Sequence, residues 1–360
     1  MLYHLLYPLS DLFSAFNVFR YITFRSIYAI VTALVMALIL APPIIRWLKA
    51  KSIGEKIRGD GPQSHLSKAG TPTMGGLIIF IALVIPTIMW ADYTNSYVLI
   101  ALTSLTLFAA IGFYDDYVKL TKTGKGISVK TKLAWQVISS LIVVALIYLV
   151  GSGDEVITRV HIPFFKDLHP DLGMLYFPFA MVVIVGAANA VNLTDGLDGL
   201  AIGPIIIAFI AYLTLCYAGG HVRIAEYLNI PYKAELGELT VFCSAAIGAA
   251  LGFLWYNFYP ATIFMGNVGS LALGGALGSV AVMSKNEIIL IIVGGVFVIE
   301  AMSVMIQVTW YRFTGKRFFK MAPIHHHFEQ MGWPEPQVII RFWIIAIILA
   351  LLSLSTLKLR

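Results

Sequence analysis

Two adjacent carboxylates, Asp115 and Asp116, are the first candidates for chemistry, and they stand at the end of an apolar run in the motif FYDDY. Neighbouring side chains on a helix point about 100° apart, so we expect the two acids to face a partner unequally, one binding a ligand while the other orients it or titrates. Acids at a helix C-terminus also oppose the helix dipole. A metal ion or the basic loop 119–132 would relieve that cost, and the alternative interpretation is a solvated helix end.

The segment NLTDGLDGL, residues 192–200, places a second polar group between two apolar runs. Asn192, Asp195 and Asp198 recur at a spacing of three, so they share one face if the segment is helical. The glycines between them let a ligand approach the backbone closely. A plain turn is the alternative, because Asn, Asp and Gly dominate turns.

Three consecutive histidines, His325, His326 and His327, stand in the segment MAPIHHHFE. Zinc sites usually space their histidines further apart, so this run indicates phosphate binding or proton transfer instead. A surface loop without function is the alternative.

Other segments add amides, hydroxyls and glycines near the ends of apolar runs. Residues 257–270 combine an amide with a proline break, and residues 67–76 place a lysine and hydroxyls before a span, where a helix N-terminus can bind an anion. The glycines of residues 274–278 indicate close helix packing. Glu300 and Gln307 lie inside an apolar run, where they either serve function or bond within the bundle.

The composition decides which elements must position these side chains. Apolar residues make up 59% of the 360-residue chain and charged residues 12%, about half the charged share of a soluble domain. A soluble domain, a disordered chain and a disulfide-stapled scaffold are therefore excluded. We expect an all-α polytopic membrane protein, a single domain over residues 1–360. About ten transmembrane helices are predicted, over residues 22–45, 75–92, 96–114, 133–151, 172–191, 200–218, 237–256, 262–283, 287–308 and 338–358.

Lysine and arginine are distributed unequally between the two sets of loops. Fifteen fall on one set (46–74, 115–132, 192–199, 257–262 and 309–337), and five fall on the opposite loops 152–171, 219–236 and 284–286. The positive-inside rule assigns the first set to the cytoplasm. With ten spans, both termini are then periplasmic. Nearly every polar cluster falls on the cytoplasmic set, which we expect to form the active site.

Acids, amides, lysines and histidines from five segments thus converge on one membrane face. This combination suits Mg²⁺ bridging acidic oxygens and phosphate, with lysines and amides that position a nucleotide diphosphate. We expect no nucleic-acid partner.

At these motifs the chain resembles the phospho-N-acetylmuramoyl-pentapeptide transferases, within the polyprenyl-phosphate N-acetylhexosamine-1-phosphate transferase superfamily. The resemblance extends over nearly the whole length. Its motifs are RxDGPxSHxxKxGTPTMGG (58–76), GFYDDY (112–117), NAVNLTDGLDGLA (189–201), FMGxVGSLALGG (264–275) and APIHHHFE (322–329).

The resemblance implies transfer of phospho-N-acetylmuramoyl-pentapeptide from its UDP derivative to undecaprenyl phosphate, which yields lipid I and UMP in peptidoglycan biosynthesis and requires Mg²⁺. It also implies a multi-pass enzyme of the bacterial inner membrane, with its active site facing the cytoplasm and a homodimeric assembly in the lipid bilayer.

The resemblance implies two sets of site residues. Catalytic roles fall on Asp115, Asp116, Asn267, His325 and His326, of which the first three are also the metal ligands. Substrate contacts fall on Lys68, Lys119, Lys132, Asn192, Asp195, Gly196, Leu197, Asp198, Asn257, Phe264, Gln307 and His327, with Lys130 as an alternative to Lys132.

One position departs from the family pattern. The family has an aspartate that binds magnesium where this sequence has Asn267. An amide oxygen can coordinate the ion but carries no charge, so we expect severely reduced activity in a retained fold. A deliberately inactivated form would account for the difference and could trap an inhibitor or a protein partner. A natural variant or a sequence error would also account for it.

Three other functions remain as alternatives: a transferase that uses UDP-N-acetylglucosamine, a transporter or lipid flippase, and a catalytically dead scaffold. For the transferase, direct attack on the β-phosphate and a two-step route through an aspartyl-phosphate are both open.

Overall fold

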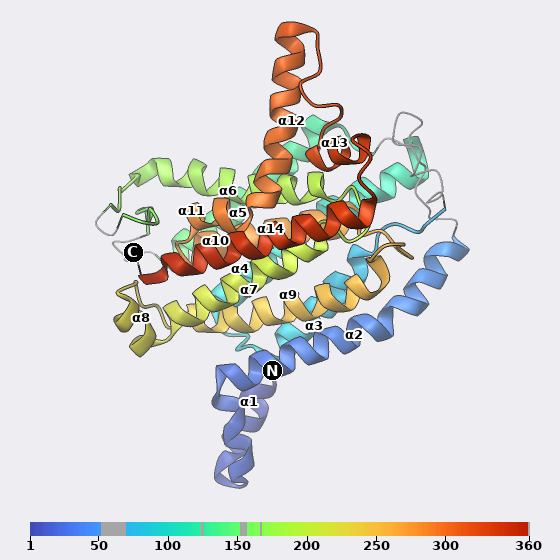
Figure 1. Cartoon of the computed structure of the whole chain (residues 1–360). Coiled ribbons are helices and arrows are strands. Elements are labelled where there is room, and N and C mark those ends of the chain that lie inside the picture. Colours follow the sequence, from blue (N-terminus) through green and yellow to red (C-terminus); the bar gives the residue numbers. More distant parts are fainter. Residues whose placement is uncertain (52–69, 124–125, 152–156, 166–167, 359–360) are drawn as a thin grey trace.

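The structure is a computed structural model, and it describes residues 1–51, 70–123, 126–151, 157–165 and 168–358. Helices form the bundle (Figure 1). The longer ones are α2 (Ile22–Ala50), α3 (Gly76–Trp90), α4 (Ser96–Val118), α5 (Val129–Val150), α6 (Tyr176–Thr194), α7 (Ile202–Gly220), α9 (Leu236–Asn257), α10 (Gly266–Met283), α12 (Gly295–Thr314) and α14 (Glu335–Ser355). The shorter ones are α1 (Leu2–Leu6), α8 (Val222–Leu228), α11 (Glu287–Val293), α13 (Ile324–Gln330), a π-helical turn η4 (Lys119–Thr123) and the 3₁₀ turns η1 (Tyr7–Asp11), η2 (Ser14–Arg20), η5 (Gly173–Leu175) and η6 (Thr356–Lys358).

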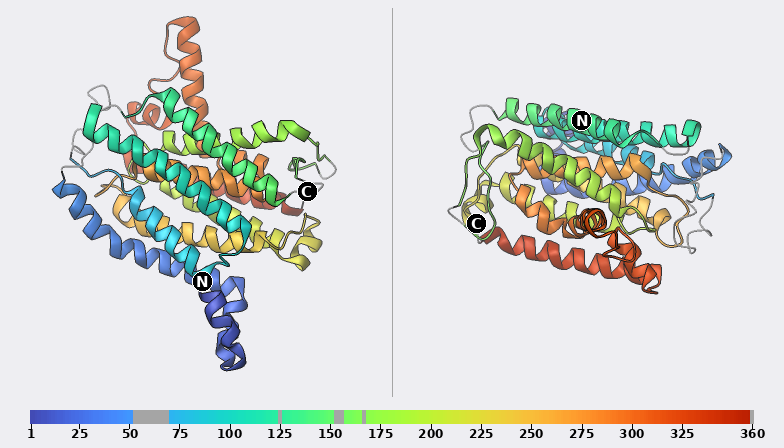
Figure 2. Two further views of the ribbon diagram at one scale, coloured as in Figure 1. Left: turned by 180° about the vertical axis from the view of Figure 1, so that it is seen from behind. Right: turned by 90° about the horizontal axis from the view of Figure 1, so that it is seen from above.

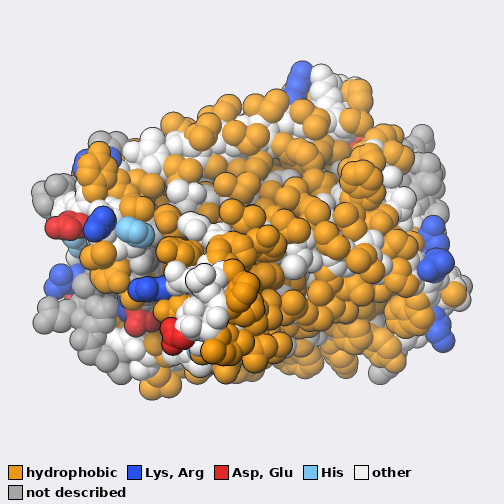
Figure 3. Space-filling view, turned by 90° about the horizontal axis from the view of Figure 1, so that it is seen from below, with side chains coloured by type: hydrophobic (Ala, Val, Ile, Leu, Met, Phe, Trp, Pro, Cys, Tyr) orange, Lys and Arg blue, Asp and Glu red, His pale blue; other side chains and the backbone are white. Residues whose placement is uncertain are grey.

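The predicted all-α polytopic fold is confirmed. Nine helices in the described ranges are long and apolar enough to cross a membrane, and α3, with 15 residues, is a shorter apolar helix. Each predicted span therefore has a helical counterpart. Hydrophobic side chains cover the middle of the surface in Figure 3, while charged side chains gather toward its two ends.

The predicted ninth span, residues 287–308, is wrong as a single helix. The chain breaks at Gly294, whose φ and ψ of −87° and 18° are not helical, and this break separates α11 from α12. Helix α12 then turns out of the bundle (Figures 1 and 2). Its buried residues end at Ser303, so only its first half packs against the other helices.

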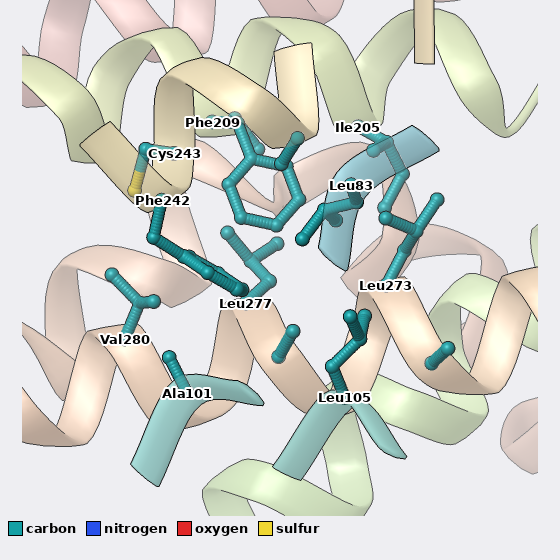
Figure 4. Packing of buried hydrophobic residues seen from close by; sticks show 14 of the residues in the cluster. Leu83, Ala101, Leu105, Ile205, Phe209, Phe242, Cys243, Leu273, Leu277 and Val280 are labelled. Carbon is teal, nitrogen blue, oxygen red and sulfur yellow. The ribbon is translucent and has the colours of Figure 1, made fainter. Parts of the chain in front are cut away.

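Helix α10 is the centre of the core. Every residue from Val268 to Met283 is buried, and the helix contacts α3, α4, α6, α7 and α9. Figure 4 shows its Leu273 and Leu277 among side chains from the surrounding helices. An α10 site residue is therefore held from several sides.

The predicted packing role of the α10 glycines is confirmed. A Cβ atom on Gly274 would lie 2.7 Å from the Ala187 oxygen and from Ala188 Cα. Those are backbone atoms of α6, so a side chain could fit only if a helix moved. The small residues of α10 thus set its distance from α6.

We expect Gly274→Ala to lower the free energy of unfolding by about 1–3 kcal/mol, the usual penalty for overpacking a core. Thermal unfolding in a single detergent measures it. Gly186→Ala is the matched control, because a Cβ atom there meets nothing within 4 Å. Equal stability changes in the two variants would contradict the packing role.

Met1 and Lys358, the first and last described residues, lie at one end of the bundle. The Met1 ammonium donates a hydrogen bond to the Ile88 oxygen near the end of α3, and Lys358 donates to the Tyr227 oxygen of α8. The Asn95 amide joins these loops by donating to the Glu235 oxygen. We call this the terminal end, and the opposite end, which holds Asp115, the aspartate end.

Candidate active site

Asp115 and Asp116 converge on one nitrogen atom at the aspartate end. The Asn267 amide Nδ2 donates to Asp115 Oδ2 at 3.0 Å and to Asp116 Oδ1 at 2.8 Å. The expectation that adjacent acids would face a partner unequally is wrong for this contact. The close approach of α10 to α4 explains the result, because a Cβ atom on Gly112 would overlap the Asn267 backbone oxygen.

The two carboxylates differ in their other partners. Asp115 Oδ1 accepts a bond from the Ile127 backbone N–H at 2.8 Å, and Asp116 Oδ2 accepts one from the Val268 N–H at 3.2 Å. Asp115 is 7% exposed and Asp116 is 2% exposed. Every carboxylate oxygen of the pair therefore accepts a hydrogen bond.

Lys132 is the cation of this cluster. Its Nζ lies 3.1 Å from Asp115 Oδ2, 3.2 Å from Asn267 Oδ1 and 3.4 Å from Asn192 Oδ1. Lys130, the alternative to Lys132, is exposed. Lys119, at the start of η4, lies within electrostatic reach of Asp116. The structure thus brings both predicted lysines of this segment to the acids.

The NLTDGLDGL segment joins the cluster through Asn192. Its Nδ2 donates to Asn267 Oδ1 at 2.7 Å and to Ser270 Oγ at 2.8 Å. Ser270 was not predicted as a site residue, although it stands in the quoted FMGxVGS motif.

A pair of amides, the buried Gln136 and the half-buried Asn189, supports the cluster from within the membrane span. Gln136 and Asn189 exchange two side-chain hydrogen bonds, of 2.7 and 3.3 Å, between α5 and α6. Gln136 follows Lys132 by four residues and Asn189 precedes Asn192 by three, so each amide lies one helical turn from a site residue. Sequence reasoning missed both, and their signal was a polar side chain inside an apolar run.

His325 meets the same segment at its glycine. It is fully buried, and its Nδ1 lies 3.0 Å from Glu300 Oε2. Its Nε2 has no hydrogen-bond partner in the described part of the chain, and it would overlap a Cβ atom on Gly196. The histidine loop and the NLTDGLDGL segment are therefore in direct contact, and the buried Glu300 serves to orient the imidazole.

Several predicted substrate residues make bonds that shape the loops. Asp198 Oδ2 accepts from the Ala261 N–H, and the buried Asn257 Nδ2 donates to the Ile263 oxygen. The Phe264 backbone bonds to residues 72 and 75, which docks the TPTMGG segment beside the start of α10. A cleft of about 630 Å³ lies next to Asp198.

Other predicted site residues lie further from the acids or point elsewhere. Gln307 Oε1 accepts from the Phe318 and Phe319 N–H groups, so its amide holds the chain after α12. The Leu197 side chain is buried in a small hydrophobic cluster with residues of α12 and α14, and its carbonyl accepts a hydrogen bond from the Leu200 N–H.

The other two histidines of the run each bond within their own loop. His326 Nδ1 lies 2.6 Å from Glu329 Oε2, and His327 Nδ1 accepts from the Lys320 N–H at 3.2 Å. Asp195 ends α6. Lys68 lies outside the described residues.

The carboxylate oxygens of Asp115 and Asp116 suit a divalent cation as ligands. Mg²⁺ is usually held by one or two carboxylates together with substrate phosphates, and here two carboxylates converge on a single atom. That atom is the Asn267 Nδ2, a hydrogen-bond donor at the point where a cation would be attracted. The amide of Asn267 would have to turn its oxygen toward the acids to join such a site.

Comparison with known proteins gives a consistent result. The family model for glycosyl transferase family 4 matches residues 96–285, and the phospho-N-acetylmuramoyl-pentapeptide-transferase signature 1 matches residues 68–80. The chain is 56% identical over 362 residues to the phospho-N-acetylmuramoyl-pentapeptide-transferase of Citrifermentans bemidjiense, and 58% identical over 363 residues to that of Desulfatibacillum aliphaticivorans; each alignment covers 100% of both chains. The bundle, the polar cluster at its aspartate end and these full-length matches together show that the chain belongs to the phospho-N-acetylmuramoyl-pentapeptide-transferase family.

Proposed function

We propose that the protein transfers phospho-N-acetylmuramoyl-pentapeptide from UDP-N-acetylmuramoyl-pentapeptide to undecaprenyl phosphate, giving lipid I and UMP in peptidoglycan biosynthesis. The observation that carries this proposal is the cluster of Asp115, Asp116, Asn267 and Lys132, joined through Asn192 to the segment that meets His325. Five polar segments far apart in the sequence supply acids, amides, a lysine and an imidazole at one end of an apolar bundle. A diphosphate that must be held and neutralised needs these groups.

Asp115 and Asp116 would hold Mg²⁺, with the Asn267 amide oxygen as a third, uncharged ligand. The ion would neutralise charge on the diphosphate while the bond to UMP breaks. Because Asn267 lacks the charge of a carboxylate, we propose that this chain is impaired in catalysis.

The lysines of the site bind the diphosphate and stabilise the charge that develops during transfer. Lys132 already touches Asp115 and Asn192, so its ammonium lies between the acids and the NLTDGLDGL segment. The acceptor phosphate attacks the β-phosphorus, the bond from that phosphorus to UMP breaks, and Asp115 accepts any proton remaining on the acceptor. The cleft beside Asp198 would take the remainder of the sugar nucleotide.

We propose that the aspartate end faces the cytoplasm of the bacterial inner membrane. In the sequence, the set of predicted loops that includes Asp115 and Asp116 carries fifteen lysines and arginines, against five on the opposite set, and the positive-inside rule assigns the richer set to the cytoplasm. Both termini, at the terminal end, are then periplasmic, and the soluble UDP substrate reaches the acids from the cytoplasm.

Release of UMP from the two substrates tests the proposed function. We expect slow UMP release that requires Mg²⁺ and undecaprenyl phosphate, stops with EDTA, and is faster with UDP-N-acetylmuramoyl-pentapeptide than with UDP-N-acetylglucosamine. The Asn267→Asp form is assayed beside the parent so that a low rate is still measurable. A preference for UDP-N-acetylglucosamine, or lipid flux across sealed vesicles without UMP release by either form, would contradict the proposal.

A further inference from the structure

A cavity of about 490 Å³ opens at the terminal end, away from the acids. It is lined by residues 157–161 and His169, by the loop of residues 229–236 and by the turn after α10. Helix α10 has Asn267 near its beginning and ends at Met283 in the cavity wall. The 16 positions between these two residues correspond to about 24 Å along the helix. The cavity is therefore not part of the transferase site.

Lysines and arginines are concentrated on this cavity, although in the sequence they are more frequent in the opposite set of loops. In the sequence, the predicted loops 152–171, 219–236 and 284–286 hold five lysines and arginines. Three of these, Arg159, Lys233 and Lys285, line the cavity in the part of the chain that the structure describes. No carboxylate is among its described lining residues; the nearby carboxylates are Asp171, exposed and within electrostatic reach of Arg159 and Lys285, and Glu287, paired with Lys285. Lysines and arginines in loops on the less basic side of a membrane protein oppose the charge difference that sets its orientation. Their concentration around one cavity therefore points to a ligand.

The fold holds two of these cations in place. Lys285, in the turn after α10, has a φ of 56°, and its Nζ donates to the Ile157 oxygen at 2.9 Å and lies 3.8 Å from the Tyr176 ring centroid. Its charge is balanced by the buried Glu287, 3.4 Å away. The Lys233 Nζ lies 5.1 Å from the Tyr97 ring centroid. The two ammonium groups are thus positioned by carbonyl and aromatic groups of the cavity wall.

A short hairpin adds the third cation and two imidazoles. Arg159 pairs with Asp171 in an antiparallel bridge, and this pairing brings the His161 and His169 rings to a centroid distance of 4.4 Å. The buried His169 Nδ1 has no hydrogen-bond partner within the residues that the structure describes. An imidazole nitrogen of this kind can bond a ligand atom.

The inner wall of the cavity is apolar. Leu215, Leu236, Val282 and Met283 line it together with Ile147. A bare inorganic anion would leave this wall without contacts, whereas an amphiphile would cover it with alkyl carbons while its head meets the cations.

From these observations we propose that the cavity at the terminal end is a second ligand site, which binds a phosphate group through Arg159, Lys233 and Lys285. The apolar wall favours a phosphate carried on a lipid over free phosphate. The site does not depend on the reaction at the aspartate end.

Native mass spectrometry of the full chain in neutral detergent tests the proposal. The probes are dodecyl phosphate, inorganic phosphate and dodecanol. The test variant is Arg159→Gln/Lys233→Gln, which leaves the Lys285–Glu287 pair intact. The matched control, Arg20→Gln/Arg223→Gln, removes two exposed arginines that are absent from the cavity lining. Lys132→Met identifies any dodecyl phosphate bound at the aspartate end.

We expect the test variant to weaken dodecyl phosphate binding at the cavity by about tenfold or more, the scale of losing hydrogen bonds to a charged group. The control should bind like the parent, and both double variants should keep the parent's UMP release and unfolding temperature, which shows that they fold. If inorganic phosphate binds as tightly as dodecyl phosphate and is lost in the same variant, the ligand is free phosphate at the same site. Equal binding by test and control variants, or dodecanol binding as tight as that of dodecyl phosphate, would overturn the proposal.

Discussion

Asn267→Asp is expected to raise Mg²⁺-dependent UMP release by about a hundredfold or more, the scale of restoring one electrostatic contact to a transition state. In the present chain the Asn267 Nδ2 bonds both Asp115 and Asp116. An aspartate would replace that donor with an acceptor, so three carboxylates would converge. Only a cation relieves the resulting repulsion, which makes the metal bind more tightly.

The same substitution should change how stability depends on Mg²⁺. A ligand that binds the folded state stabilises it in proportion to its affinity, so Mg²⁺ should raise the unfolding temperature of the Asn267→Asp form more than that of the parent. Asn17→Asp, which adds the same charge at an exposed position, should leave both readouts at the parental level. If the Asn267→Asp form and the parent release UMP at the same rate, the metal-ligand role of this position is wrong.

Lys132→Met should have the second-largest effect. Made in the Asn267→Asp form, so that a loss can be measured, it is expected to lower UMP release by about a hundredfold or more. Methionine keeps the unbranched shape but removes the ammonium that contacts Asp115, Asn192 and residue 267. Without this ammonium, no lysine at the centre of the cluster neutralises the negative charge of the diphosphate.

Lys130→Met is the matched control for this experiment, because it removes the same charge from an exposed position two residues away. We expect its rate to stay within about twofold of its parent, since exposed charges interact weakly. Measuring kcat and KM separately shows whether Lys132 acts on the chemical step or on substrate binding. Similar losses in the two variants would mean that Lys132 acts only through the general positive charge of the loop.

The register of α5 decided which lysine reaches the acids. Lys132 and Gln136 are one turn apart and therefore share a face, and the hydrogen-bonded pair of Gln136 with Asn189 turns that face toward α6. Lys130 is two residues from Lys132 and lies on another face of the helix. The sequence left both lysines open, because the apolar run of α5 shows no strong one-sided pattern.

The broken ninth span shows a second limit of local patterns. Residues 287–308 read as one apolar run, and glycines are common inside membrane helices. Gly294 and Gly295 end one helix and begin the next. Whether such a glycine pair packs within a helix or breaks it depends on the helices that surround it, and the local sequence does not show which helices these are.

From the residues alone one can predict the class of the protein, its apolar runs, the loops in which polar residues collect and the family motifs. Hydropathy, charge and motif matches depend only on residues that are close in the sequence. The packing of the helices alone reveals that Asp115 and Asp116 share one Asn267 nitrogen, that His325 meets Gly196, and that three cations line a cavity at the terminal end. Such contacts join residues as far apart as the 152 positions between Asp115 and Asn267. They exist because the small residues of α10 let α4 and α6 approach it closely, and that approach is a property of packed helices rather than of any one segment.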